Sequence, residues 1–283
     1  MNKIYSIGLS TTLVALLSAC GSSDSDTVDQ AITDAGNSAS TALKGVTLEV
    51  KDDKSATNAV SSVASIGSTT AGTSPAVARL SVGYGSGNCD SGGTYNISGN
   101  QNGGTASYSN CSENGVTLNG SYTYTISETN GITTTKINAN NFSITSSYNT
   151  TKLNYSLEHQ EKDADSFYLV VKVNGTFETA GGPHSYKGGF ENFNYTVQDK
   201  DNASIDGKFS IDMGEINSCA NGIYDVKTLV TLDPTDNNPR TFDSGKMTVN
   251  GATIEFHQGG TATVTFADGN TTTVNQGAIV SCD

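Results

Sequence analysis

The chain has 283 residues, enough for one large domain or two small ones, and a formal net charge of −13. A chain this acidic lacks the basic patches that nucleic acids and anionic lipid headgroups require, so both are excluded as partners. Hydrophobic residues make up only 35% of the chain, which predicts that part of it has no packed core.

The N-terminus has the pattern of an export signal. Lys3 supplies a positive start, and residues 4–17 form a mostly apolar run that is too short for a comfortable membrane span. The run ends in Leu17-Ser18-Ala19-Cys20, which resembles the lipobox of bacterial lipoproteins. The resemblance implies that residues 1–19 are a signal peptide and that the mature protein begins at a lipidated Cys20. A plain secretory signal or an uncleaved membrane anchor is the alternative.

The resemblance also implies where the protein resides. In lipoproteins the cysteine receives a diacylglyceryl group and the new N-terminus is acylated, and several acyl chains give stable attachment to a membrane where one does not. Gly21 stands where an aspartate would direct retention at the inner membrane. The implied location is therefore the bacterial outer membrane, with the periplasmic or extracellular face left open. Loss of residues 1–19 leaves 14 basic and 28 acidic residues, a net charge of −14.

The region between the cysteine and the first strands is expected to be only partly ordered. Residues 20–27 are small and acidic, typical of a flexible tether. Residues 28–79 form a partly helical linker in which the apolar positions of 28–43 follow a period near 3.6. A second short helix is expected around Ala59 to Ile66, and Leu48 and Val50 suggest a short strand. This region is either a helical cap on the next domain or part of a long stalk.

The residue pattern of 80–283 is typical of a hairpin-rich β domain. Asn-Gly or Asp-Gly pairs occur at 102–103, 114–115, 119–120, 130–131, 174–175, 206–207, 221–222, 250–251 and 268–269. Such pairs supply the positive φ angles that type I′ hairpin turns need, and alternating apolar residues flank several of them. The fold class is therefore mainly β: an antiparallel, hairpin-rich meander after a flexible, partly helical N-terminal region. A sandwich, a twisted sheet and a partly closed barrel all satisfy the pattern.

Two further patterns concern the interior of this domain. The nearly continuous apolar run Phe167 to Val173 predicts a central strand that is covered on both faces. Tyrosines recur along the expected strands, where they suit either plain sheet packing or a carbohydrate-binding face. They are Tyr122, Tyr124, Tyr155, Tyr168, Tyr186, Tyr195 and Tyr224.

Four cysteines remain besides Cys20, and they suit an oxidising compartment. They are Cys89, Cys111, Cys219 and Cys282, which allow three pairings. Proximity in sequence favours Cys89–Cys111 and Cys219–Cys282 as two structural disulfides. Free thiols in a reducing setting are the alternative. No C-x-x-C motif is present, so redox or zinc chemistry is not expected.

The sequence offers little support for catalysis. The three histidines, His159, His184 and His257, form no metal-binding motif. No serine-hydrolase elbow or nucleotide-binding loop is found. Acidic residues gather at 158–165, 199–206 and 233–236, but none of these groups has the pattern of an EF-hand loop, and they are interpreted as solvated turns. No cofactor, metal or catalytic residue is therefore predicted.

We expect a lipid-anchored envelope or surface lipoprotein with a non-catalytic binding, display or structural role. Its expected partners are the membrane, through the anchor, and another envelope protein or a glycan. The alternative is a periplasm-facing factor for outer-membrane assembly or lipid handling, which requires a curved sheet around an apolar cavity. An enzyme acting on glycans is a third class, and it requires two carboxylates close together in a cleft.

Overall fold

The computed structural model describes residues 43, 45–71, 85–100, 102–113, 115–162, 168–181, 185–199, 201–214, 218–235 and 241–278. The expected signal peptide, Cys20, the tether and the helical pattern of residues 28–42 lie outside these ranges. Within them the protein is mainly β, and its only α-helix is α3 (Asp53–Ala71).

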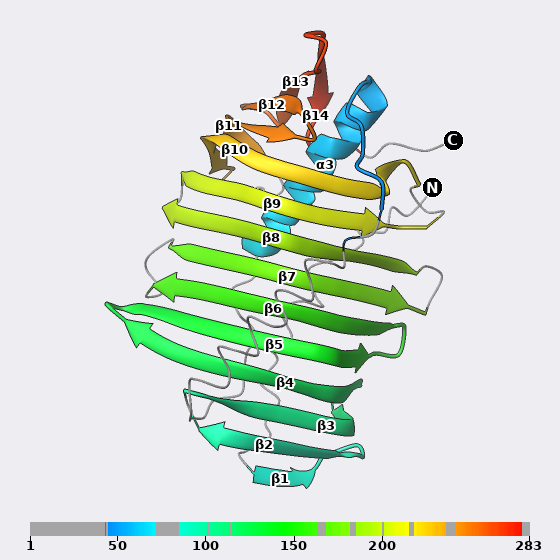
Figure 1. Ribbon diagram of the computed structural model, residues 1–283, viewed down its shortest axis with the longest axis vertical. Coiled ribbons are helices and arrows are strands. Elements are labelled where there is room, and N and C mark those ends of the chain that lie inside the picture. The colour runs from blue at the N-terminus through cyan, green and yellow to red at the C-terminus, as the bar shows by residue number, and fades with distance from the viewer. Residues whose placement is uncertain are drawn as a thin grey trace.

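The strands form one antiparallel sheet whose spatial order equals the sequence order, from β1 to β14 (Figure 1). The predicted meander is thus confirmed as a single open, twisted sheet rather than a sandwich or a closed barrel. The strands are β1 (Gly85–Asn88), β2 (Thr94–Asn100), β3 (Gly103–Glu113), β4 (Val116–Thr129), β5 (Ile132–Thr145), β6 (Thr150–Lys162), β7 (Leu169–Ala180), β8 (Tyr186–Asp199), β9 (Asn202–Asp212), β10 (Gly222–Pro234), β11 (Phe242–Val249), β12 (Ala252–His257), β13 (Thr261–Thr265) and β14 (Thr271–Asn275).

The period-2 alternation separates two chemically different faces. Directly paired residues share a face, and one cross-strand row runs through Ile137, Leu157, Val173 and Phe193, all buried. We call this side the apolar face. The adjacent row runs through Lys136, Glu158, Lys172 and Asn194, all half-buried or exposed. We call the side that carries this row the polar face.

Aromatic rings reinforce the apolar face. A chain of ring contacts passes from Phe177 through Phe190, Phe193 and Phe209 to Tyr224, with centroid separations from 6.2 Å for the first pair to 4.7 Å for the last. Five of the listed tyrosines are likewise buried: Tyr122, Tyr124, Tyr155, Tyr195 and Tyr224. These five serve sheet packing rather than a carbohydrate-binding face.

Helix α3 covers the apolar face at the C-terminal end of the sheet (Figure 1). The carboxylate of Asp52 caps it by accepting the backbone N–H of Ser55 at 2.8 Å. Ala56, Ala59, Val60 and Val63 are fully buried at helical spacing and belong to the same core as the sheet. The expected short helix is therefore present but longer, and it is a cap on the sheet.

Residues 45–50, which we call the strap, join the sheet before α3 begins. Thr47 forms an isolated parallel bridge with Ile223, and Leu48 N–H donates to the Ile223 carbonyl at 3.1 Å. The side chain of Asn250 donates to the Leu48 carbonyl at 2.7 Å. The expected strand at Leu48 and Val50 is thus reduced to a single bridge on β10.

The Asn/Asp-Gly pairs serve two purposes, and the expectation of hairpin turns is wrong for three of them. Asn130-Gly131 and Asn250-Gly251 have positive φ at both residues and connect β4 to β5 and β11 to β12. By contrast, the pairs at 119–120, 174–175 and 206–207 lie inside β4, β7 and β9. The sequence alone does not separate the two uses, because both exploit the backbone freedom of glycine.

The mid-strand pairs hold β-bulges in neighbouring strands. A bulge leaves a backbone N–H without its ladder partner. The side chain of Asn174 accepts such an N–H from Asn192 of β8 at 2.6 Å, and Asp206 accepts one from Thr228 of β10 at 3.1 Å. The following glycines, Gly175 and Gly207, have φ of +140° and +108°, which lets the neighbouring strand approach closely.

The predicted central strand is β7, in the middle of the sheet. Val170 and Val171 are both buried although they point to opposite faces, as the prediction requires. Lys172 is exposed and pairs with Glu158 of β6 at 2.7 Å. The apolar run is therefore covered on both faces only at its beginning.

One predicted disulfide is fully described. Cys89, just after β1, is bonded to Cys111 of β3 with a Cα–Cα distance of 5.3 Å. Cys219 is also disulfide-bonded. Its expected partner, Cys282, lies outside the described residues, so that pairing stays a prediction.

The C-terminal strands curl so that the end of β14 meets the beginning of β11. The buried amide of Gln276 bonds the backbone of Phe242 on both sides: it accepts the N–H at 2.7 Å and donates to the carbonyl at 2.7 Å. The same amide donates to the Thr261 carbonyl at 3.0 Å. One side chain thereby connects β11, β13 and the end of β14.

Candidate binding groove on the polar face

The histidines do not form a site. His159 lies on β6, His257 lies on β12, and His184 is outside the described residues. His257 is hydrogen-bonded through Nε2 to the Thr263 hydroxyl at 2.9 Å. His159 is only 3% exposed and its Nε2 has no hydrogen-bond partner. Burial lowers the pKa of His159 to about 4, because the interior disfavours the imidazolium ion.

The acidic groups are occupied by structural contacts. Glu158 forms the ion pair with Lys172, and Asp206 holds the β10 bulge. The Asp199 carboxylate accepts the Asp201 N–H at 3.0 Å and the Asn202 amide at 2.6 Å, which is a local turn. Asp163, Asp165 and Asp236 lie outside the described residues.

A buried carboxyl lies beside the Cys89–Cys111 disulfide. Glu113 is 5% exposed, and its pKa is raised mainly by burial and further by the carboxylate of Asp90. The two sulfurs and the Glu113 carboxyl are close together. Because the sulfurs are bonded to each other, they cannot act as thiolate ligands for a metal.

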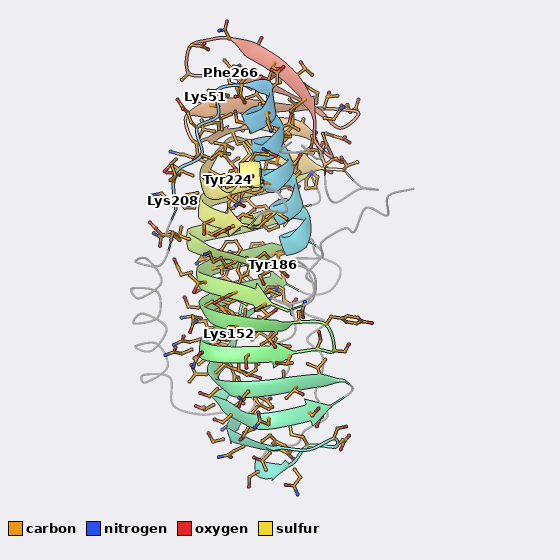
Figure 2. All side chains as sticks on the ribbon, turned by 90° about the vertical axis from the view of Figure 1, so that its right-hand side faces the viewer. Lys51, Lys152, Tyr186, Lys208, Tyr224 and Phe266 are labelled. Atoms are coloured by element: carbon orange, nitrogen blue, oxygen red, sulfur yellow. A yellow bond between two sulfur atoms is a disulfide. The ribbon has the colours of Figure 1, made fainter. Side chains whose placement is uncertain are left out.

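A groove of about 650 Å³ lies on the polar face, between the strap and strands β6 to β9. Figure 2 shows Lys152 and Lys208 extending from the side of the sheet opposite α3, which is the side that carries the groove. Gly45 and Val46 of the strap form one wall, and Val46 is 82% exposed. The polar side chains of the lining are Lys152, Asn154, Thr176, Glu178, Lys187, Ser210, Asp212 and Asn221.

Hydrogen-bond donors and acceptors are sorted by strand within this groove. Lys152 and Asn154 of β6 pair directly with Glu178 and Thr176 of β7, respectively. The ammonium of Lys152 and the amide NH₂ of Asn154 are donors, and the amide oxygen of Asn154 is already occupied by the N–H of Asn141 at 2.6 Å. The Glu178 carboxylate is an acceptor, and the Thr176 hydroxyl can accept as well as donate. One positive charge on β6 therefore lies opposite one negative charge on β7, each beside a neutral polar side chain.

On the β8–β9 side of the groove, the two charged side chains neutralise each other. Lys187 of β8 pairs with Asp212 of β9 at 3.1 Å. The pKa of Asp212 is lowered, first by the Gly214 N–H that it accepts and then by Lys187. Asp212 is therefore ionised and already engaged by Lys187 and the Gly214 N–H.

A second groove, of about 490 Å³, lies at the β1 end of the sheet. Its lining is dominated by hydroxyl and amide side chains: Ser86, Asn88, Thr94, Asn96, Ser107 and Ser109. It has no charged side chain among these residues, so it offers less specificity than the groove on β6 to β9.

Of the residues that line the β6–β9 groove, sequence reasoning named only the Asn221-Gly222 pair, as a turn, and none of Lys152, Asn154, Thr176 and Glu178. The pairing of β6 with β7 aligns Lys-x-Asn with Thr-x-Glu, two patterns separated by more than twenty residues. Only the register of the pairing, which the residues between the strands help to set, places these four side chains together. A search for oppositely charged positions equidistant from the β6–β7 connection is the signal that finds them.

Comparison of the chain with protein-family models, with curated proteins and with solved structures found no match. In the described part of the chain, no helix combines the length and apolar character needed to cross a membrane.

Proposed function

We propose that this chain is a lipid-anchored lipoprotein of the bacterial outer membrane whose folded part has a non-catalytic binding or display role. The Leu17-to-Cys20 sequence supports the anchor. The observation that carries the binding role is the polar face of the sheet, which presents hydroxyl, amide and charged side chains and is hollowed by two grooves. Its partner is a glycan or another component of the envelope.

The polar face suits binding because its groups are fixed in a regular array. Paired positions on neighbouring strands have Cβ atoms about 4.5–5.5 Å apart. Side chains held on such a framework lose less conformational freedom on binding than side chains on loops. The apolar face supplies the core that keeps the array rigid.

The anchor and its orientation are tested together on intact cells. We expect the wild-type protein to fractionate with the outer membrane and to incorporate a clickable palmitate analogue, and the Cys20→Ala variant to lose both properties. Digestion of whole cells by a protease then separates the two faces: rapid loss indicates extracellular display, and protection until the envelope is opened indicates the periplasmic face. Unchanged fractionation and labelling of Cys20→Ala would refute the anchor.

The alternative, a lipid-handling factor, would place acyl chains against the apolar face, whose side chains are buried in the core of this structure. The apolar face extends without interruption across most of the sheet, from Tyr108 on β3 to Val274 on β14, and is rich in aromatic rings. A protein that carries lipid would release acyl chains in proportion to protein when it is extracted with organic solvent after removal of its own anchor. Mass spectrometry of that extract decides the alternative, and an extract without stoichiometric lipid rejects it.

A further inference from the structure

The groove on β6 to β9 carries an unmatched pair of opposite charges. Lys152 and Glu178 are cross-strand neighbours and both are exposed, yet they form no ion pair among the described residues. On the same face, the directly paired residues Lys172 and Glu158 form an ion pair at 2.7 Å, and Lys246 and Glu255 form one at 3.0 Å. Glu178 is also directly paired with Lys187 of β8, but the ammonium of Lys187 forms its ion pair with Asp212 at 3.1 Å. Lys152 and Glu178 are therefore the two charged side chains of the lining that have no ion pair among the described residues.

Each charge has a neutral neighbour of matching hydrogen-bond character. Two positions along β6, on the same face as Lys152, Asn154 adds an N–H donor. In the same way Thr176 adds a hydroxyl acceptor next to Glu178 on β7. The donor pair suits an anion with several oxygens, and the acceptor pair suits an ammonium group with several N–H bonds.

The spacing and the wall chemistry restrict the ligand further. The two subsites lie at directly paired positions of adjacent strands, where the Cβ atoms of the two residues are about 5 Å apart. The two-carbon linker of ethanolamine holds a phosphate and an ammonium group at a comparable spacing. Quaternary ammonium groups are recognised by aromatic cages, and the only aromatic residue in the described lining, Phe177, has its ring packed against Phe190 on the apolar face. A primary ammonium group is therefore preferred over choline.

We propose that this groove binds phosphoethanolamine, with the phosphate on Lys152 and Asn154 and the ammonium on Glu178 and Thr176. A zwitterion also agrees with the net charge of −13, which opposes a purely anionic ligand. The proposal rests on the proposed binding role and gives it a ligand class. The ligand is either the headgroup of a phospholipid or the free compound, because both present the same chemistry.

The test is calorimetric titration of the purified full-length protein with O-phosphoethanolamine, phosphocholine and inorganic phosphate. We expect O-phosphoethanolamine to bind at least tenfold more tightly than either of the others. Lys152→Gln and Glu178→Gln should each weaken it at least tenfold, and Lys172→Gln, on the same face but outside the groove, should change it less than twofold. Thermal unfolding of each variant verifies that it is folded.

Flotation with vesicles distinguishes a phospholipid headgroup from the free compound. The Cys20→Ala variant is used so that the protein's own lipid cannot drive attachment. Co-flotation with phosphatidylethanolamine vesicles but not with phosphatidylcholine vesicles identifies the lipid headgroup, and binding of the free compound alone identifies a soluble ligand.

Three results would overturn the proposal: no binding of O-phosphoethanolamine at millimolar concentration, equal binding of phosphocholine, or undiminished binding by the two groove variants. Any of these leaves the anchor experiments on Cys20 unaffected, so failure of the ligand assignment is distinguishable from failure of the proposed function.

Discussion

The buried imidazole of His159 makes the stability of this sheet depend on pH. In the unfolded chain a histidine has a pKa near 6.5, and in the fold burial lowers it to about 4. The unfolded state therefore binds the proton more readily, so the stabilisation is fully present above about pH 6.5 and is lost as the pH falls towards 4. Converted at about 1.36 kcal/mol per pKa unit, the whole effect is about 3 kcal/mol, of which about 2 kcal/mol is lost between pH 7 and pH 5.

Urea unfolding at pH 7 and pH 5 measures this loss. Other groups also titrate in this range, so the informative quantity is the difference between variants. Between the two pH values we expect the free energy of unfolding of His159→Leu to fall by about 2 kcal/mol less than that of the wild type. His257→Gln is the matched control, because His257 lies on β12 within hydrogen-bond reach of Thr263 and away from the β6 core. If His159→Leu and the wild type have the same pH dependence, the argument from burial is wrong.

Three further predictions concern stability and are checked by chemical denaturation. Gly175→Ala should lower the free energy of unfolding by more than 2 kcal/mol, because the new Cβ would lie 2.3 Å from backbone atoms of β6. The control is Gly251→Ala, whose Cβ meets nothing within 4 Å and which should lower it by only about 1 kcal/mol. Equal losses would contradict the bulge geometry. Replacing Cys89 and Cys111 together by alanine should cost about 3 kcal/mol for a loop of 22 residues, and an unchanged midpoint would show that the disulfide does not constrain the unfolded chain. Gln276→Ala should cost about 2–3 kcal/mol because it leaves buried backbone groups of β11 unpaired, and a smaller loss would mean that water replaces the amide.

Much of the fold could be predicted from the sequence because its signals are local. Alternation of apolar and polar residues defines the strands, and the Asn130-Gly131 and Asn250-Gly251 turns reverse the chain between them. The same dipeptide inside β7 has a different role, because the side chain of Asn174 accepts a hydrogen bond from the N–H of Asn192 in the bulge of β8. A neighbouring strand that is distant in sequence decides between the two uses, so the dipeptide itself carries no information about the choice.

The groove depends on non-local information to an even greater extent. Lys152 and Glu178 have no unusual sequence context, and each on its own is an ordinary exposed charge. A slip of one residue in the β6–β7 register would move Glu178 to the opposite face. The wall of the groove also requires the strap, whose attachment to Ile223 joins residues more than 170 positions apart. Periodicity in the sequence does not predict either contact.

The order of strands in the sheet has a consequence for how the chain folds. Since every strand pairs with its neighbours in sequence, the sheet can grow one hairpin at a time from any nucleus. The strap and helix α3 are exceptions. In α3, Asn58 contacts Cys219 and Ser61 contacts Ala278, across 161 and 217 residues. Docking of this helix must wait for strands made much later in synthesis. The apolar face at the C-terminal end therefore stays uncovered until the last hairpin has formed, and this interval is when the chain is most exposed to aggregation.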